Sequence, residues 1–250
     1  MNKNYFRFAL VLTLAMTSCE YAQNGNTTDR GPASQTTPGT SPSPSPTPKA
    51  TPAPTATPKP TATPVPSTGS AKPLWESKVA DGVNWTAHVM NKLDTLGVDM
   101  LDVVPADIAT FCPSFKKFTY TQRKEFFTYL ISAMTKYESS FNPNEFYREG
   151  FNDASGNAVI SRGLLQISIE SANSYGCGFK DAQQLHDPYL NLNCGIRILN
   201  RWIGQRDLRL AGKIADGWKG GARYWSVLRT TSGSYSSIVS LTNGTSLCKL

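Results

Sequence analysis

Proline dominates one part of the sequence and limits where a folded domain can lie. Thirteen of the 17 prolines fall between Pro32 and Pro73, and no apolar run interrupts that stretch. Such a segment cannot bury enough surface to offset the entropy lost on ordering it. Residues 75–250 are numerous enough for one domain that buries roughly 70% of its chain surface. We therefore expect one compact domain on a tether, not a multi-domain protein, a polytopic membrane protein or a coiled coil.

The charge of the chain is modest once the tether is set aside. The formal net charge is +7, but the expected domain holds 19 basic and 16 acidic side chains. A balance this even, with the two signs interspersed, argues against nucleic acid as a partner. The charge therefore says little about what the domain binds.

Residues 1–18 have the layout of an export signal. Lys3 and Arg7 precede an apolar run that is too short to span a bilayer, and small residues follow it. Cys19 stands directly after these small residues, where a bacterial lipoprotein carries its lipid; ordinary secretion with an incidental cysteine is the alternative. We expect residues 19–74 to be the lipidated Cys19 plus a disordered Pro/Ser/Thr-rich linker. The protein would then be exported and anchored to a membrane, in the periplasm or at the cell surface.

The cysteines of the domain predict disulfides. If Cys19 carries lipid, an even number remains for an exported domain: Cys112, Cys177, Cys194 and Cys248. Two disulfides are then expected, and the sequence leaves three connectivities open. Zinc is the alternative, but no two cysteines form a C-x-x-C pair, and the two histidines, His88 and His186, are isolated. We therefore expect no metal site and no cofactor.

Hydrophobic spacing in the domain is helical nearly throughout. One apolar face recurs over several turns from Trp85 to Leu96, and Gly97 can end that helix. Thr119 and Gln122 have the spacing of a capping box. They open a second helix, whose apolar side is formed by Phe126, Phe127, Leu130, Ile131 and Met134.

The rest of the domain adds helices and little β-structure. Gly163–Ala172 and Leu192–Trp202 are also predicted as helices from the spacing of their apolar residues. Residues 141–161 are rich in Asn, Gly, Asp and Pro, which favours a loop or a short hairpin. The fold class predicted from these patterns is mainly α.

One acidic residue falls on the buried face of a predicted helix. Glu138 lies four residues after Met134 and seven after Ile131, near the C-terminal end of the helix. Burial and the negative end of the helix dipole both disfavour an ionised carboxyl group there, so we expect a raised pKa. A carboxyl group that stays protonated at neutral pH can act as a general acid. A core glutamate paired with lysine or arginine is the alternative.

Three motifs, in order, carry a resemblance to a known family. They are Y-E-S-S-F-N-P at 137–143, S-R-G-L-L-Q-I at 161–167, and D-P-x-x-N-L-x-x-G-x-x-x-L at 187–199. Together they resemble the soluble-type lytic transglycosylase domain, which is related to goose-type lysozymes and is glycoside hydrolase family 23-like. The resemblance covers roughly residues 115–230. It implies a lysozyme-like fold with a short loop or hairpin after the catalytic helix.

The resemblance also implies an activity. Members of the family cleave the β-1,4 bond between N-acetylmuramic acid and N-acetylglucosamine in peptidoglycan. Glu138 would protonate the leaving oxygen and then act as base, either toward the muramyl 6-hydroxyl, giving a 1,6-anhydro product, or toward water, as a lysozyme does. One glutamate suffices in this family because the substrate's own N-acetyl group stabilises the developing positive charge.

Four further residues are expected to bind or orient the substrate. Ser139 would orient the carboxylate or the sugar, and the amide of Gln166 would contact sugar hydroxyl and acetamido groups. Asn191 either faces the cleft or caps the helix that follows Pro188. The family's late Tyr-Asn-Ala-Gly segment has no clean counterpart; either 218–221 occupies its place or Tyr224 supplies the hydroxyl near Glu138, and we choose Tyr224.

Other acidic residues leave the exact reaction and substrate open. Carboxylates at Glu145, Glu149, Asp153 or Glu170 could pair with the amine of deacetylated glucosamine and favour deacetylated glycan, although a solvated helix face is the simpler interpretation of Glu170. Asp153 or Glu149 could also direct a water molecule and favour hydrolysis. Both the anhydro-forming reaction and hydrolysis therefore remain open.

Two functions from other classes are weighed against the enzyme. A non-catalytic peptidoglycan-binding scaffold lipoprotein would keep the fold without turnover, and the altered Tyr-Asn segment allows it. An adhesin displayed on the Pro/Thr stalk would explain the tether but not the three ordered motifs. We expect a monomeric glycan-cleaving enzyme whose partners are peptidoglycan strands and, through Cys19, a membrane.

Overall fold

The computed structural model describes residues 71–250, so the leader, Cys19 and nearly all of the linker lie outside the described residues. The fold is mainly helical, as predicted. The helices are α1 (Gly82–Leu96), α2 (Val98–Asp102), α3 (Ile108–Phe111), α4 (Tyr120–Glu138), α5 (Ile169–Ser174), α6 (Pro188–Leu199) and α7 (Gly233–Asn243). Short 3-10 turns are η1 (Leu74–Ser77), η2 (Pro113–Lys117), η3 (Ala182–His186), η5 (Gly220–Arg223), η6 (Ser226–Leu228) and η7 (Leu247–Lys249), and η4 (Asn200–Asp207) is π-helical.

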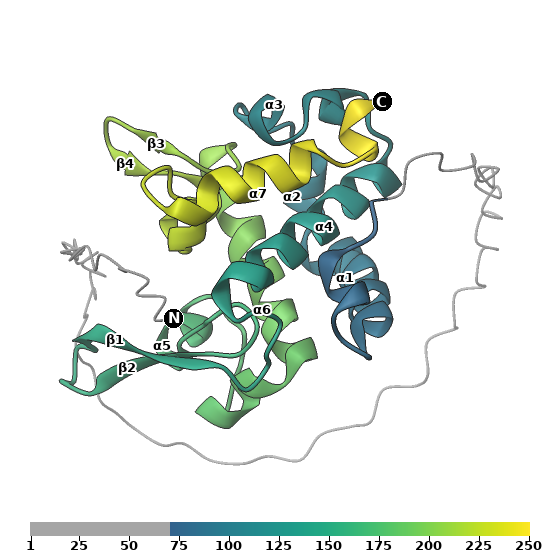
Figure 1. Cartoon of the computed structure of the whole chain (residues 1–250). Coiled ribbons are helices and arrows are strands. Elements are labelled where there is room, and N and C mark those ends of the chain that lie inside the picture. Colours follow the sequence, from purple (N-terminus) through teal and green to yellow (C-terminus); the bar gives the residue numbers. More distant parts are fainter. Residues whose placement is uncertain (1–70) are drawn as a thin grey trace, which may run out of the picture. The chain divides into compact units, whose positions relative to one another are not determined.

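Helix α4 runs through the centre of the domain, between α1 and α7 (Figure 1). The predicted capping box is present at its start: the Thr119 hydroxyl accepts from the backbone N–H of Gln122, whose side chain accepts from the backbone N–H of Thr119. Ten consecutive residues of α4, Phe126–Thr135, are buried. A helix buried on every side is surrounded by other elements, which is why α4 forms the axis of the core.

The polar residues inside α4 bond to their own helix. The hydroxyls of Thr128, Ser132 and Thr135 donate to backbone carbonyls three or four residues earlier, at 2.7–2.9 Å. Ser132 also accepts from the backbone N–H of Leu74, at 3.1 Å. These bonds satisfy the buried hydroxyls and attach the start of the described chain to the central helix.

Two other predicted helices are confirmed, with shifted ends. α1 buries Trp85, Val89 and Leu93 and ends at Gly97. α6 begins at Pro188, because the Asp187 carboxylate caps the N–H groups of the next turn, and it continues as the π-helical η4 beyond the predicted end. The predicted segment Leu192–Trp202 therefore lies within a longer helical stretch.

The prediction of a helix over Gly163–Ala172 is wrong for its first half. Arg162 and Ile167 exchange both backbone hydrogen bonds, at 3.0 Å, and close a tight turn. Gly163 and Gln166 have φ angles of +74° and +49°, which a helix does not allow. A helix forms only at α5, where the Ser168 hydroxyl caps the N–H of Ser171.

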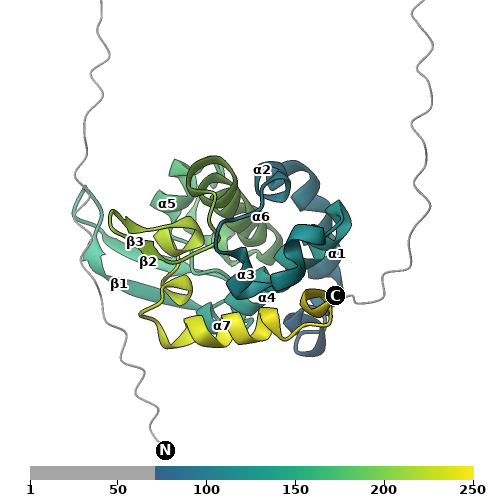
Figure 2. The ribbon, with the colours of Figure 1, turned by 90° about the horizontal axis from the view of Figure 1, so that it is seen from above.

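Two antiparallel hairpins supply the strands. β1 (Phe146–Asn152) pairs with β2 (Ala158–Arg162), which confirms the loop or hairpin expected after the second helix. The smaller hairpin joins β3 (Lys213–Ile214) to β4 (Gly217–Trp218). Both hairpins project from the same side of the domain in two perpendicular views (Figures 1 and 2).

Two disulfides close the chain on itself, and the structure selects one of the three pairings. Cys112, just before η2, bonds to Cys248 near the C-terminus. Cys177, after α5, bonds to Cys194 in α6. The first bond ties the end of α3 to η7, and the second ties the segment after α5 to α6.

Candidate active site

Glu138 is the last residue of α4 and is partly buried. Two non-glycine residues with positive φ, Ser140 at +53° and Phe141 at +66°, follow it and turn the chain sharply out of the helix. Such backbone is strained and is found where a site requires a particular geometry. The carboxyl group is therefore held at the point where the central helix meets the β1–β2 hairpin.

Two side chains from the later part of the chain lie within electrostatic range of Glu138. Burial raises the pKa of the Tyr224 phenol, and the negative charge of Glu138 adds to that rise. Burial lowers the pKa of the Arg229 guanidinium, and the charge of Glu138 opposes the change. Glu138, Tyr224 and Arg229 therefore form one electrostatic cluster. Nothing in the spacing of the sequence indicated Arg229, because it is 91 positions from Glu138 and belongs to none of the three motifs.

Ser139 is buried and bonds to backbone. Its hydroxyl lies 2.9 Å from the carbonyl oxygen of Leu164 and 3.2 Å from that of Thr135. We expected this hydroxyl to orient the carboxylate or the sugar. In the structure it joins the end of α4 to the Gly163–Ile167 turn.

Asn191 holds the same turn from the other side. It is fully buried; its Oδ1 accepts from the N–H of Leu165 at 2.9 Å, and its Nδ2 donates to the carbonyls of Arg162 and Leu185. The helix cap belongs to Asp187 instead. The predicted capping role of Asn191 is therefore wrong, and its buried amide is bonded to three backbone groups; substrate contact through Asn191 stays a prediction.

The glycine of the second motif is required by this packing. A Cβ on Gly163 would lie 2.1 Å from the Leu185 carbonyl oxygen and 2.4 Å from the Asn191 amide nitrogen, and the φ of +74° also favours glycine. Gly163, Leu185 and Asn191 therefore fix the turn against α6.

Gln166 is also buried, and its amide nitrogen is engaged inside the protein. Nε2 donates to the carbonyl oxygens of Gly163 at 2.9 Å and Glu145 at 3.2 Å. These bonds tie the turn to the base of the hairpin and leave the amide oxygen as the group for a sugar donor. Substrate contact through Gln166 stays a prediction.

Tyr224 belongs to an aromatic stack that lines the other side of the site. Its ring packs on Trp225 and on Tyr175, with centroid distances of 4.7 and 5.9 Å. Hydrogen bonding to the Ser171 side chain and to the Ser168 backbone opposes the effect of burial on its pKa. The Trp225 indole donates to the Leu165 carbonyl at 2.8 Å, which attaches the stack to the turn.

The four additional carboxylates occupy different environments. Glu149 is the one residue of β1 that is not fully exposed, and Ser161 of β2 donates to its Oε1 at 2.6 Å. Glu145 is exposed at the base of the hairpin. Asp153 accepts from backbone N–H groups of the hairpin turn, which lowers its pKa, and Glu170 is exposed in the first turn of α5.

Residues 71–250 also bear on a metal site and on a membrane span. No group of three or more His, Cys, Asp or Glu side chains there could hold a metal ion. No helix in the same range is long and apolar enough to cross a membrane. A hollow lined by residues of α1 and α4 lies apart from the Glu138 cluster, with which it shares no residue.

Comparison with known proteins identifies the family. The model of the transglycosylase SLT domain matches residues 117–215, which include Glu138, the turn and Asn191. No curated protein sequence matches. Wild-type DslA is 57% identical over 70% of this chain and 97% of its own, with a TM-score of 0.69.

Two variants of DslA are equally similar. In each of them one glutamate is replaced by glutamine, at positions 11 residues apart, and each is 56% identical over 72% of this chain and 98% of its own, with a TM-score of 0.70. The fold is therefore lysozyme-like, as the motifs implied. The chain belongs to the transglycosylase SLT domain family of glycan-cleaving enzymes.

Proposed function

We propose that this protein cleaves the β-1,4 bond between N-acetylmuramic acid and N-acetylglucosamine in peptidoglycan, with Glu138 as general acid and base. The observation that carries the proposal is the position of Glu138. It is a partly buried carboxyl group at the end of the central helix, within the family match, and its charge acts on Tyr224 and Arg229.

The surroundings of Glu138 suit a group that gives up a proton and takes it back. In the first step the carboxyl group protonates the leaving glycosidic oxygen. The positive charge of Arg229 then stabilises the carboxylate that remains, so that it can act as base in the second step. The turn at Gly163–Ile167, held by Ser139 and Asn191, keeps the wall of the site rigid during both steps.

The spacing of the glutamates supports a second carboxylate at Glu149. The two glutamates replaced in the DslA variants are 11 residues apart, as are Glu138 and Glu149. The hydrogen bond from Ser161 to Oε1 fixes the orientation of the Glu149 side chain. An ionised carboxylate can orient water for attack, so we propose hydrolysis, as in a lysozyme, as the reaction.

The same carboxylates are the best candidates for recognising a deacetylated sugar. The ammonium group of glucosamine would pair with a solvent-accessible carboxylate. Glu145, at the base of the hairpin, is exposed, and Glu149 in β1 is partly exposed and accepts a hydrogen bond from Ser161 at one oxygen. The carboxylate of Asp153 is used by its own turn. We therefore propose that deacetylated glycan is cleaved faster than acetylated glycan; equal rates, or faster cleavage of acetylated glycan, would refute this preference.

The attachment to a membrane is a separate part of the proposal. The sequence places Cys19 directly after an export signal, and we propose that it carries lipid in the mature protein. Mass spectrometry of the N-terminal peptide from the native membrane fraction would detect the acyl chains. An unmodified peptide that begins elsewhere would refute lipidation without affecting the enzymatic proposal.

The activity is tested by mass spectrometry of the products formed from purified peptidoglycan. The wild type is compared with Glu138→Gln, Glu149→Gln and a control, Glu170→Gln, which removes an exposed carboxylate of α5. We expect products with reducing ends from wild type and control, and a rate about 10²- to 10⁴-fold lower for Glu138→Gln. If the wild type forms anhydro products and Glu149→Gln still forms them, the reaction is transglycosylation and the proposal of hydrolysis is wrong. Glycan binding without cleavage by wild type would favour the non-catalytic scaffold.

A further inference from the structure

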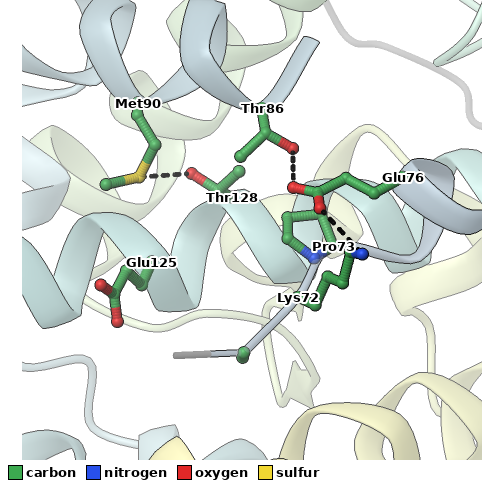
Figure 3. Close-up of a pocket in the computed structure, with 8 residues that line it drawn as sticks. Lys72, Pro73, Glu76, Thr86, Met90, Glu125 and Thr128 are labelled. Atoms are coloured by element: carbon green, nitrogen blue, oxygen red, sulfur yellow. Dashed lines mark hydrogen bonds and ion pairs between the residues drawn. The ribbon is translucent and has the colours of Figure 1, made fainter. Parts of the chain in front are cut away.

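A hollow of about 390 Å³ lies on a part of the domain that the proposed catalysis does not use. Its walls come from α1, α4 and the segment that leads into η1 (Figure 3). The lining residues are Ala71, Lys72, Pro73, Glu76, Thr86, Met90, Glu125 and Thr128. The volume falls in the range of small-molecule sites.

Glu125 contributes a carboxylate oxygen that has no partner in the described part of the chain. Its Oε2 is buried and makes no hydrogen bond there. Burial raises the pKa of this carboxyl group, because no donor compensates the loss of water. Buried polar atoms are nearly always paired, so an orphaned carboxylate oxygen beside a hollow indicates a missing donor.

The second carboxylate of the hollow, by contrast, is satisfied. The Thr86 hydroxyl donates to Glu76 Oε1 at 2.7 Å, and the Trp75 indole donates to the Thr86 oxygen at 2.8 Å. Lys72 lies 3.8 Å from Glu76 Oε2, but its side chain is 72% exposed. The lining therefore holds two carboxyl groups and one ammonium group that is mostly in solvent, and this balance of charge favours a cation in the hollow.

The rest of the wall is suited to an aliphatic chain. Ala71, Pro73 and the thioether of Met90 are apolar, and the Thr128 hydroxyl is already engaged by the carbonyl of Lys124 and by the Met90 sulfur. Glu125 and Glu76 lie on opposite sides of this apolar surface (Figure 3).

The hollow is remote from the catalytic cluster. Glu125 and Glu138 are 13 residues apart on α4, which is about 20 Å along the helix axis. A ligand in the hollow therefore does not touch the bond that is cleaved at Glu138.

We propose that the hollow binds a primary ammonium group on a short aliphatic chain, with Oε2 of Glu125 accepting its hydrogen bond. The ammonium supplies both the missing donor and the positive charge, and the methylene groups cover Pro73 and Met90. A free diamine and the side chain of a lysine-like residue in a peptide carry this same chemistry.

Methyl NMR of the mature protein labelled at its methionines tests the site. Met90 reports on the hollow, its signal is assigned with Met90→Leu, and the core residues Met100 and Met134 serve as references. The probes are 1,5-diaminopentane, a lysine tripeptide with blocked ends, and 1-pentanol as the uncharged control. We expect a saturable shift of Met90 with at least one amine and none with the alcohol.

Glu125→Gln keeps the shape of the side chain and removes the charge, so binding should weaken about tenfold or more. Asp102→Asn removes an exposed carboxylate elsewhere and should leave binding unchanged. A response to the diamine alone would identify a free amine as ligand, and a response to the peptide alone a peptide. Absence of both responses, an equal response to pentanol in the wild type, or unchanged binding by folded Glu125→Gln would overturn the proposal.

Discussion

The side chain of Asn191 connects three segments that build the wall of the site, so its removal should be costly. Its amide bonds to the N–H of Leu165 and to the carbonyls of Arg162 and Leu185, at 2.9–3.0 Å, and the residue is fully buried. Leucine has as many side-chain heavy atoms as asparagine but no polar atoms. Asn191→Leu would therefore remove the partner of the Leu165 N–H and of the Leu185 carbonyl, while the carbonyl of Arg162 keeps its bond from the N–H of Ile167.

The expected loss follows mainly from the Leu165 N–H and the Leu185 carbonyl. A buried donor or acceptor left unsatisfied costs about 1–3 kcal/mol. The carbonyl of Arg162 keeps the N–H of Ile167 as a partner and contributes least. We therefore expect Asn191→Leu to lower the free energy of unfolding by about 4 kcal/mol, a large part of the 5–15 kcal/mol that is typical of a domain.

Urea denaturation followed by circular dichroism measures this loss. Asn193→Leu is the control on the same helix, since the Asn193 side chain makes one partly buried contact, between its Oδ1 and Nε2 of His88 at 2.8 Å. The control should lose about 1 kcal/mol. A loss below about 1 kcal/mol for Asn191→Leu, or one equal to that of the control, would refute the reasoning that the hydrogen bonds of Asn191 stabilise the Gly163–Ile167 turn.

Three other predictions concern stability. The disulfide Cys112–Cys248 spans 136 residues and Cys177–Cys194 spans 17. Replacing the first pair by serine should lower the free energy of unfolding in denaturant by about 5 kcal/mol, and replacing the second by about 3 kcal/mol, because the longer loop gains more entropy when it is opened. A larger loss for the shorter loop would contradict this argument. Burial raises the pKa of Asp207, but hydrogen bonds from Arg223 and a backbone N–H outweigh it and leave the pKa below 3.8. The ionised Asp207 therefore stabilises the fold fully above its unfolded-state pKa, and this stabilisation is lost as the pH falls through its folded-state pKa. In Asp207→Asn the urea midpoint should depend less on pH in that range. An unchanged pH dependence would contradict this prediction. Thr119→Ala should cost about 1 kcal/mol in thermal unfolding, and no loss would mean that the capping box is not stabilising.

Local patterns were enough to predict most of the fold. The apolar face from Trp85 to Leu93, the end at Gly97 and the capping box at Thr119 are all set by residues within one or two helical turns of each other. The turn-rich composition of residues 141–161 likewise indicated the hairpin. The prediction failed where two positive φ angles break the helix, at Gly163 and Gln166, because a run of apolar residues looks alike in a turn and in a helix.

The motifs located the candidate site but did not predict what each of its residues contacts. Spacing on α4 placed Glu138 on the core-facing side, and the family motifs gave it a role. The side chains of Ser139 and Asn191 were expected to face substrate, yet both bond to backbone. The sequence does not distinguish a polar side chain that binds a sugar from one that bonds to a backbone carbonyl. The burial of the side chain in the folded structure shows which groups it can reach.

Composition and neighbours along the chain were enough to predict the helical class, which the structure confirms, and to single out Glu138 as the candidate acid; the tether stays a prediction, because nearly all of it lies outside the described residues. The pairing of Cys112 with Cys248, the electrostatic interaction of Arg229 with Glu138, and the hollow beside a Glu125 oxygen that has no partner within residues 71–250 came only from the packed structure. These depend on residues that are distant in the sequence. Their distances are fixed when the elements pack around α4, and no local pattern contains that information.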